Sequence, residues 1–153
     1  MQCRTCLSVS KIKPIFLESR IFEGKYWIIE HVYPVKYKGW FVIVLKKHKE
    51  ALYQLIKEEF DELRLLQENL IKAIHKVLNN QKEYCCCFTE GEGFKHIHFH
   101  IIAVSNKLPE KLRGTGIFSL VKVTPEESFP KNEIVKTCNF VKKELNNLML
   151  KKA

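Results

Sequence analysis

The sequence predicts an α+β fold: an antiparallel β-sheet of about five strands with one long helix and a C-terminal helix. Three observations favour this class. Short β-branched and aromatic segments occur in neighbouring pairs, as the strands of hairpins do. One long stretch carries apolar residues every three or four positions, which is the period of a helix. Strands and helices do not alternate, so the βαβ units of a parallel sheet are not expected.

The first two strands are expected at residues 26–31 and 40–45, because both segments are rich in aromatic and β-branched side chains. Pro34 and Gly39 mark the turn or short loop between them. From Ala51 the period changes, and one amphipathic helix is predicted as far as the Asn79-Asn80 pair. Its apolar face would consist of Leu52, Leu55, Ile56, Phe60, Leu63, Leu66, Leu70, Ile74, Val77 and Leu78.

Two more strands are expected at residues 84–89 and 96–104, with a glycine-containing loop between them. The chain is then expected to be irregular, with a short apolar piece at residues 117–123. Residues 132–150 predict the C-terminal helix, since Ile134, Val135, Cys138, Val141, Leu145 and Leu148 fall on one side of it.

Length and composition favour a single domain over residues 1–153. With 46% hydrophobic and 28% charged residues, the sequence is typical of a soluble globular protein and unlike disordered or fibrous chains. No apolar run reaches the roughly 18 residues that span a bilayer, and the N-terminus has no signal-peptide profile, so we expect a cytoplasmic protein without a membrane partner. The net charge of +9 favours anionic partners in general and selects none of them.

The six cysteines do not predict a disulfide framework or a disulfide-linked partner, because the expected compartment is reducing. Cys3 and Cys6 form a C-x-x-C pair, which is half a zinc site, a redox dithiol or a coincidence. The redox interpretation lacks the usual strand before the pair. The run 85–87 is three cysteines that resemble a buried strand, since a free cysteine packs as a small hydrophobe.

Three histidines alternate with apolar residues in the segment 96–102, which reads His-Ile-His-Phe-His-Ile-Ile. On a strand, His96, His98 and His100 would share one face at a spacing of about 6.6–6.8 Å. A dry core would leave too many ring nitrogens unpaired, so this face must meet solvent, a metal or an anion. Catalysis by an imidazole nucleophile is the favoured interpretation. A chance cluster on an exposed face and a purely metal-binding row remain the alternatives.

This segment resembles the histidine triad pattern, His-φ-His-φ-His-φ-φ with φ apolar, and the order of the predicted elements over residues 1–104 is similar to that family. Residues 105–153 would form a C-terminal extension with a helix. The resemblance implies a nucleotide hydrolase or nucleotidyl transferase that cleaves at an α-phosphate of dinucleoside polyphosphates or nucleoside phosphoramidates. It also implies a nucleotide substrate and a homodimer formed through the sheet and the long helix.

By position, the resemblance makes His98 the nucleophile, which forms a covalent nucleotidyl-histidine, and His100 a hydrogen-bonding partner of the phosphate or leaving group. Gly91 and Gly93 would bind the substrate through backbone N–H groups, which suit phosphate oxygens, and Thr89 would bind it through its hydroxyl, which can donate one hydrogen bond. A zinc-binding subset of the family carries a C-x-x-C pair and two histidines. Here they correspond to Cys3, Cys6, His48 and His96, a closed set typical of structural zinc.

The loop before the triad departs from the family pattern. Thr89 stands where an Asn or Gln is common, and Gly93 where a hydroxyl residue is common. Glu90 and Glu92 would repel a phosphate unless they face water. A second hypothesis is therefore a non-catalytic nucleotide- or RNA-binding protein that retains the fold. The sequence does not predict the base, the leaving group or the choice between hydrolase and transferase.

Overall fold

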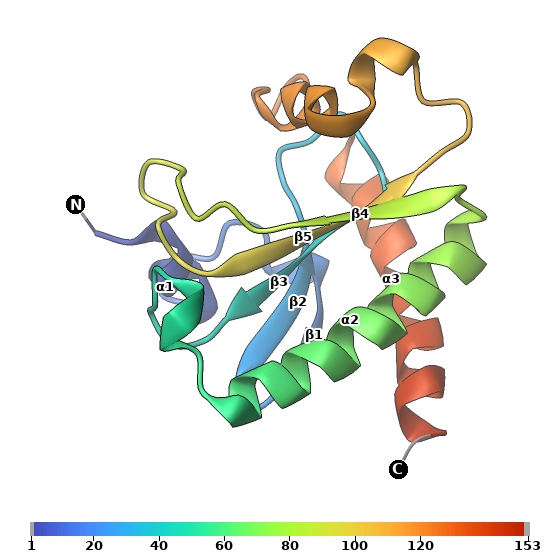
Figure 1. Ribbon diagram of the computed structural model, residues 1–153. Helices are drawn as coiled ribbons and strands as arrows, with labels where there is room; N and C mark the ends of the chain where they lie inside the picture. The colour runs from blue at the N-terminus through green and yellow to red at the C-terminus, as the bar shows by residue number, and fades with distance from the viewer. Residues whose placement is uncertain (1, 152–153) are drawn as a thin grey trace.

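The centre of the molecule is an antiparallel sheet, and two long helices lie on one of its faces (Figure 1). The computed structural model describes residues 2–151; residues 1, 152 and 153 fall outside the described part of the predicted domain. The strands are β1 (Arg20–Glu23), β2 (Trp27–His31), β3 (Trp40–Leu45), β4 (Lys82–Cys86) and β5 (His98–Val104). Their order in the sheet is β1-β2-β3-β5-β4, and every neighbouring pair is antiparallel. The predicted α+β class is thus confirmed.

The helices are α1 (Arg4–Val9), α2 (Lys57–Leu78) and α3 (Lys131–Leu150). Short 3₁₀ turns complete the chain: η1 (Leu17–Ser19), η2 (Leu52–Gln54), η3 (Glu110–Leu112) and η4 (Gly114–Val121). Helices α2 and α3 pack against each other, and Figure 1 shows α2 running along the sheet. None of the helices described is long and apolar enough to cross a membrane.

One hydrophobic core lies between the sheet and these helices. It joins strand residues such as Trp27, Ile43 and Ile101 to Leu66 and Leu70 of α2. The region after β5 belongs to the same core through Ile117, Ile134, Cys138, Val141 and Leu145. The opposite face of the sheet carries a smaller apolar cluster of Ile28, Val42 and Val44.

The long helix begins later than its apolar pattern predicts, at Lys57 and not at Ala51. The backbone of Ile56 is extended, and its N–H donates to the Glu59 carboxylate at 2.9 Å. This bond caps the first turn, which fixes the start of the helix at the next residue. The predicted end is correct, because Asn79 adopts a left-handed conformation, with φ of 50°, that terminates the helix.

The strands around the triad also differ from the prediction. The segment expected at 84–89 is paired over Lys82–Cys86, and the segment expected from residue 96 is paired only from His98. The triple cysteine is not a buried strand: β4 is an edge strand, and Cys85 is exposed. The short elements α1 and β1 are absent from the sequence prediction, since neither has enough residues to show a period.

Candidate functional site

A cavity of about 510 Å³ lies on the face of the sheet opposite α2. Alternation along the strands places Glu30, Val42, Val44, His98 and His100 on this face. Aromatic side chains supply much of the remaining wall, namely Phe16, Tyr33, Phe88, Phe94 and Phe118. The cavity is therefore largely apolar, with histidines and carboxylates as its ionisable groups.

Cross-strand pairing fixes which residues meet in this cavity. His98 of β5 lies opposite Val44 of β3, and His100 lies opposite Val42. Val42 in turn lies opposite Glu30 of β2. The two imidazoles are thus neighbours on one strand, with ring centroids 4.9 Å apart. Glu30 stands two strands away in the row of His100.

The hydrogen bonds of His98 determine its tautomer. Nδ1 lies 2.7 Å from the carbonyl oxygen of His96, and a carbonyl oxygen can only accept, so Nδ1 carries the proton. The lone pair of His98 is then on Nε2. Burial lowers the pKa of His98 below its usual 6.5, so the ring is neutral at pH 7 and Nε2 is available as a nucleophile.

His100 is held by an aromatic neighbour. The indole Nε1 of Trp40 donates to Nδ1 of His100 at 3.0 Å. Phe118 of η4 contacts both rings, with centroids 5.2 Å from Trp40 and 5.4 Å from His100. Burial, and then the nearby His98, lower the pKa of His100 to about 3, which keeps it neutral at physiological pH.

A buried ion pair borders the other end of the cavity. Arg20 of β1 donates from Nε and Nη2 to the same Glu30 oxygen, Oε2, with both distances 3.3 Å. Arg20 also donates from Nη2 to the carbonyl oxygen of Ser8 at 3.0 Å. Burial raises the pKa of Glu30, and the neighbouring guanidinium opposes that rise. The pair ties β1 and β2 to α1.

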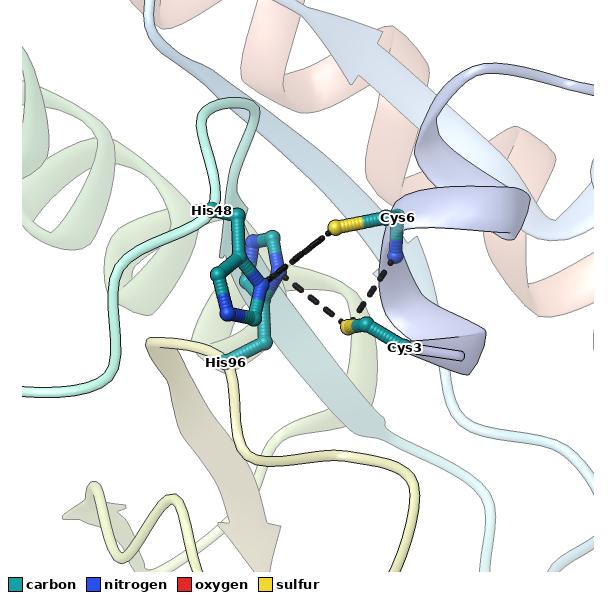
Figure 2. Close-up of side chains that lie close together, drawn as sticks. All are labelled: Cys3, Cys6, His48 and His96. Carbon is teal, nitrogen blue, oxygen red and sulfur yellow. Dashed lines mark hydrogen bonds between the residues drawn. The ribbon is translucent and has the colours of Figure 1, made fainter. Parts of the chain in front are cut away.

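A second group of side chains lies at the end of the sheet nearest α1. Cys3 directly precedes α1, and Cys6 lies within it. His48 comes from the loop after β3, and His96 from the residues before β5 (Figure 2). One ligand atom from each residue lies within 4.8 Å of all the others. Figure 2 shows both imidazoles turned toward the two sulfurs.

Four of the six separations within this group match those of a metal ion with tetrahedral coordination, and all six lie within 4.8 Å. Nδ1 of His96 lies 3.6 Å from Sγ of Cys3 and 3.5 Å from Sγ of Cys6. Nδ1 of His48 lies 3.4 Å from Sγ of Cys6 and 3.3 Å from Nδ1 of His96. In a tetrahedral site, zinc bonds of about 2.3 Å to sulfur and about 2.0–2.1 Å to nitrogen place a sulfur and a nitrogen about 3.6 Å apart and two nitrogens about 3.4 Å apart. Two sulfurs and two imidazoles are also the donor set that structural zinc prefers.

Neighbouring acceptors turn both imidazoles so that Nδ1 faces the group. Nε2 of His96 donates to the carbonyl oxygen of Leu45 at 2.6 Å, so its Nδ1 presents a lone pair. Nε2 of His48 lies 3.3 Å from the Glu50 carboxylate. Burial, followed by a hydrogen bond with Cys3, raises the pKa of Cys6 to about 11, and a metal ion would reverse this by binding the thiolate.

Several solved structures are similar to this chain in fold. A hypothetical histidine triad nucleotide-binding protein from Sulfolobus tokodaii aligns with a TM-score of 0.71 and 16% identity, covering 95% of this chain and 93% of that one. A zinc-bound histidine triad family protein from Mycobacterium smegmatis aligns with a TM-score of 0.70 and 16% identity, covering 95% and 94%. This chain has the histidine triad fold.

A diadenosine triphosphate hydrolase from Plasmodium falciparum, solved with cyclomarin A, has the same fold. It aligns with a TM-score of 0.62 and 16% identity over 85% of this chain and 78% of that one. No protein-family model matches the sequence, and no curated protein matches it. The similarity to these proteins is thus one of fold.

Within the histidine triad fold, the predicted site residues divide between two places. His98, His100, Thr89 and Gly91 line the cavity. Cys3, Cys6, His48 and His96 form the sulfur–nitrogen group, which we call the Cys/His group. Gly93 lies near that group, where its carbonyl oxygen accepts from the N–H of Arg4 at 2.8 Å. The three triad imidazoles therefore do not form a single row at one site.

In the loop before the triad, Thr89 is constrained by its backbone conformation and by a side-chain hydrogen bond. Thr89 has a φ of 56°, which a β-branched residue rarely adopts, and its hydroxyl donates to the carbonyl oxygen of Glu50 at 3.1 Å. This bond joins the cavity-lining loop to the segment that holds His48. The hydroxyl hydrogen expected for a substrate is thus already used within the protein.

Sequence reasoning missed Trp40, Phe118 and the Arg20–Glu30 pair. A signal existed for Glu30, because it is the only charged residue within the apolar strand β2. Trp40 and Phe118 read as ordinary core residues in the sequence, and only the folded chain brings them to His100.

Proposed function

We propose that this protein is a nucleotide hydrolase or nucleotidyl transferase that cleaves at an α-phosphate through a covalent intermediate on His98. The observation that carries the proposal is the hydrogen bond from Nδ1 of His98 to the carbonyl oxygen of His96 at 2.7 Å. It leaves a lone pair on Nε2 of a neutral imidazole beside a cavity of about 510 Å³, a volume suited to a small-molecule ligand.

In the proposed first step, Nε2 of His98 attacks the α-phosphorus. A phosphorus–nitrogen bond forms, and the bond from phosphorus to the leaving group breaks with its electron pair, which takes up a proton from solvent. In the second step, the oxygen of water or another acceptor attacks the same phosphorus and gives up its proton to solvent, the phosphorus–nitrogen bond breaks with its electron pair returning to Nε2, and the neutral imidazole is restored. His100 would donate a hydrogen bond to the phosphoryl group, and the loop at Thr89 and Gly91 would face its oxygens. Gly93 would act through the shape of that loop.

Apolar and aromatic side chains suit the base and ribose of a nucleotide. Phe16, Tyr33 and Phe94 line the cavity, and aromatic rings offer faces for stacking. Lysine and arginine are absent from its lining among the described residues. An electrostatic RNA groove would need them, so the cavity favours a nucleotide over RNA as its ligand.

We also propose that zinc binds Cys3, Cys6, His48 and His96. The separations of the Cys/His group and its donor set support a closed structural site. Zinc held there would supply structure by fixing α1 and the start of β5. We propose a homodimer and a cytoplasmic location from the family resemblance. The edge strand β4 offers unpaired backbone groups with which a second copy of the chain would pair. Light scattering would test the dimer by measuring the molar mass in solution.

The test of the enzyme is nucleotide release from adenosine 5′-phosphoramidate and from a dinucleoside polyphosphate. Wild type should release the monophosphate, and His98→Ala should not. His75→Ala is the matched control, because His75 is an exposed histidine on α2. Equal inactivity of wild type and His98→Ala across a broad nucleotide panel would overturn the proposal, and binding without release would favour the non-catalytic alternative.

A further inference from the structure

We propose that Trp40 is a positioning residue that fixes His100 as a permanent Nε2–H hydrogen-bond donor toward the cavity. This inference rests on the proposed function for its consequence in catalysis. The tautomer itself is a property of the protein alone and can be tested without substrate.

The first step concerns the donor. An indole nitrogen donates and cannot accept, so the bond of 3.0 Å from Nε1 of Trp40 requires a lone pair on Nδ1 of His100. A neutral imidazole has one N–H, and with Nδ1 as acceptor the proton must be on Nε2. Trp40 does not titrate, so this assignment does not change over the working pH range.

The second step concerns how firmly the pair is held. Trp40 is completely buried in the core, and its ring meets the ring of His100 edge to face at 5.9 Å. Phe118 closes against both rings, with centroids 5.2 Å from Trp40 and 5.4 Å from His100. The register of β3 and β5 sets the approach, because His100 lies opposite Val42, two residues from Trp40 on the same face.

The third step concerns what His100 can do chemically. With Nδ1 engaged, His100 cannot take a second proton without breaking the bond to Trp40. It therefore acts as a fixed donor to a phosphoryl oxygen or leaving group, and it does not shuttle a proton. Lysine and arginine are absent from the described lining of the cavity, so no cationic side chain of that lining competes with this N–H for a phosphate.

His98 and His100 consequently have opposite roles at Nε2. In His98 the Nδ1 proton points to the carbonyl oxygen of His96, which leaves a lone pair on Nε2. In His100 the lone pair points to Trp40, which leaves a proton on Nε2. Two adjacent imidazoles of the same strand thus provide one acceptor and one donor, each assigned by a different neighbour.

The test compares imidazole tautomers by long-range ¹H–¹⁵N NMR in wild type, Trp40→Phe and Trp27→Phe. Trp27 is the matched control: it is also completely buried, and its indole donates at 2.8 Å to the Glu59 carbonyl oxygen, away from the cavity. We expect His100 to be purely Nε2–H in wild type and Trp27→Phe, and a tautomer mixture in Trp40→Phe. A wild-type His100 protonated at Nδ1 overturns the proposal, even if Trp40→Phe does not fold.

Turnover of adenosine 5′-phosphoramidate measures the consequence. We expect Trp40→Phe to lower kcat about tenfold, the effect of one lost oriented hydrogen bond, with little change in KM. Trp27→Phe should retain wild-type kcat even if its stability falls. An unchanged His100 tautomer in folded Trp40→Phe overturns the inference. If wild type shows no turnover while the tautomers are as expected, the proposed function fails and the role of Trp40 in fixing His100 stands.

Discussion

The carbonyl oxygen of His96 accepts the Nδ1 proton of His98 at 2.7 Å. The ring of His96 belongs to the Cys/His group, while the ring of His98 faces the cavity. The backbone of one group therefore orients the imidazole of the other, over a distance of two residues. Any displacement of the Cys/His group should be transmitted to the cavity through this bond.

The first prediction concerns metal content. We expect wild type to contain one equivalent of zinc by elemental analysis, and Cys3→Ser/Cys6→Ser to contain none, because serine does not replace a thiolate ligand. Loss of the metal should lower Tm by about 10 °C in calorimetry. Cys85→Ser is the control, since Cys85 is an exposed thiol on β4, outside the Cys/His group. Metal-free native protein would contradict the prediction.

The second prediction concerns Glu50, whose carboxylate lies 3.3 Å from Nε2 of His48. Glu50→Ala should weaken zinc binding about tenfold in competition with a chromophoric chelator, because the carboxylate holds Nδ1 toward the sulfurs. Glu92→Ala is the matched comparison, because Glu92 lines the same hollow. Equal zinc affinity in the two variants would show that Glu50 does not orient the ligand.

The third prediction concerns the buried pair of Arg20 and Glu30. Arg20→Leu should lower the free energy of unfolding by about 3–5 kcal/mol in urea titrations, since it leaves Glu30 without its cation. Arg20→Leu/Glu30→Leu should recover part of the loss. Lys57→Leu breaks an exposed pair with Asp61 and should change little. A double variant no more stable than Arg20→Leu would argue against an unpaired charge as the cause.

The fourth prediction concerns pH. His31 is buried, donates from Nδ1 to the Val32 carbonyl oxygen, and accepts at Nε2 from the Gly39 N–H. Burial lowers its pKa from 6.5 to about 4. The unfolded chain therefore binds more protons between these values, so the contribution of His31 to stability is complete above pH 6.5 and falls as the pH drops toward 4. The loss is about 3 kcal/mol.

We expect the variant His31→Gln to show a shallower fall in stability between pH 6.5 and 4, measured by urea midpoints across that range. His75→Gln is the matched comparison, because it makes the same substitution at an exposed histidine of α2. Parallel curves for wild type and His31→Gln would assign the pH dependence to other groups.

Much of this architecture follows from local pattern. The alternation of His98, Phe99 and His100 predicts the two faces of β5, because the period of a strand is a property of the sequence itself. The C-x-x-C pair alone leaves several interpretations open, and it is the resemblance to the histidine triad family that implies the set with His48 and His96, which the structure brings together.

The rest depends on long-range contacts. Trp40 meets His100 only because β3 and β5 pair in one register, which no local period encodes. Gly93 lies beside the Cys/His group because its carbonyl oxygen is bonded to the Arg4 N–H. Helix α2 begins at Lys57 because a carboxylate caps the preceding residue, although the apolar period extends further back.

The pairing of β5 on both sides has a consequence for which residues reach the cavity. Side chains alternate along a strand, so a slip of one residue would exchange His98 and His100 for Phe99 and Ile101. β5 forms backbone hydrogen bonds with β3 on one side and with β4 on the other, so a slip would break both sets of hydrogen bonds at once. The edge strand β4 therefore helps to fix the register of β5. We expect shortening of β4 to shift the register of β5 before it unfolds the protein.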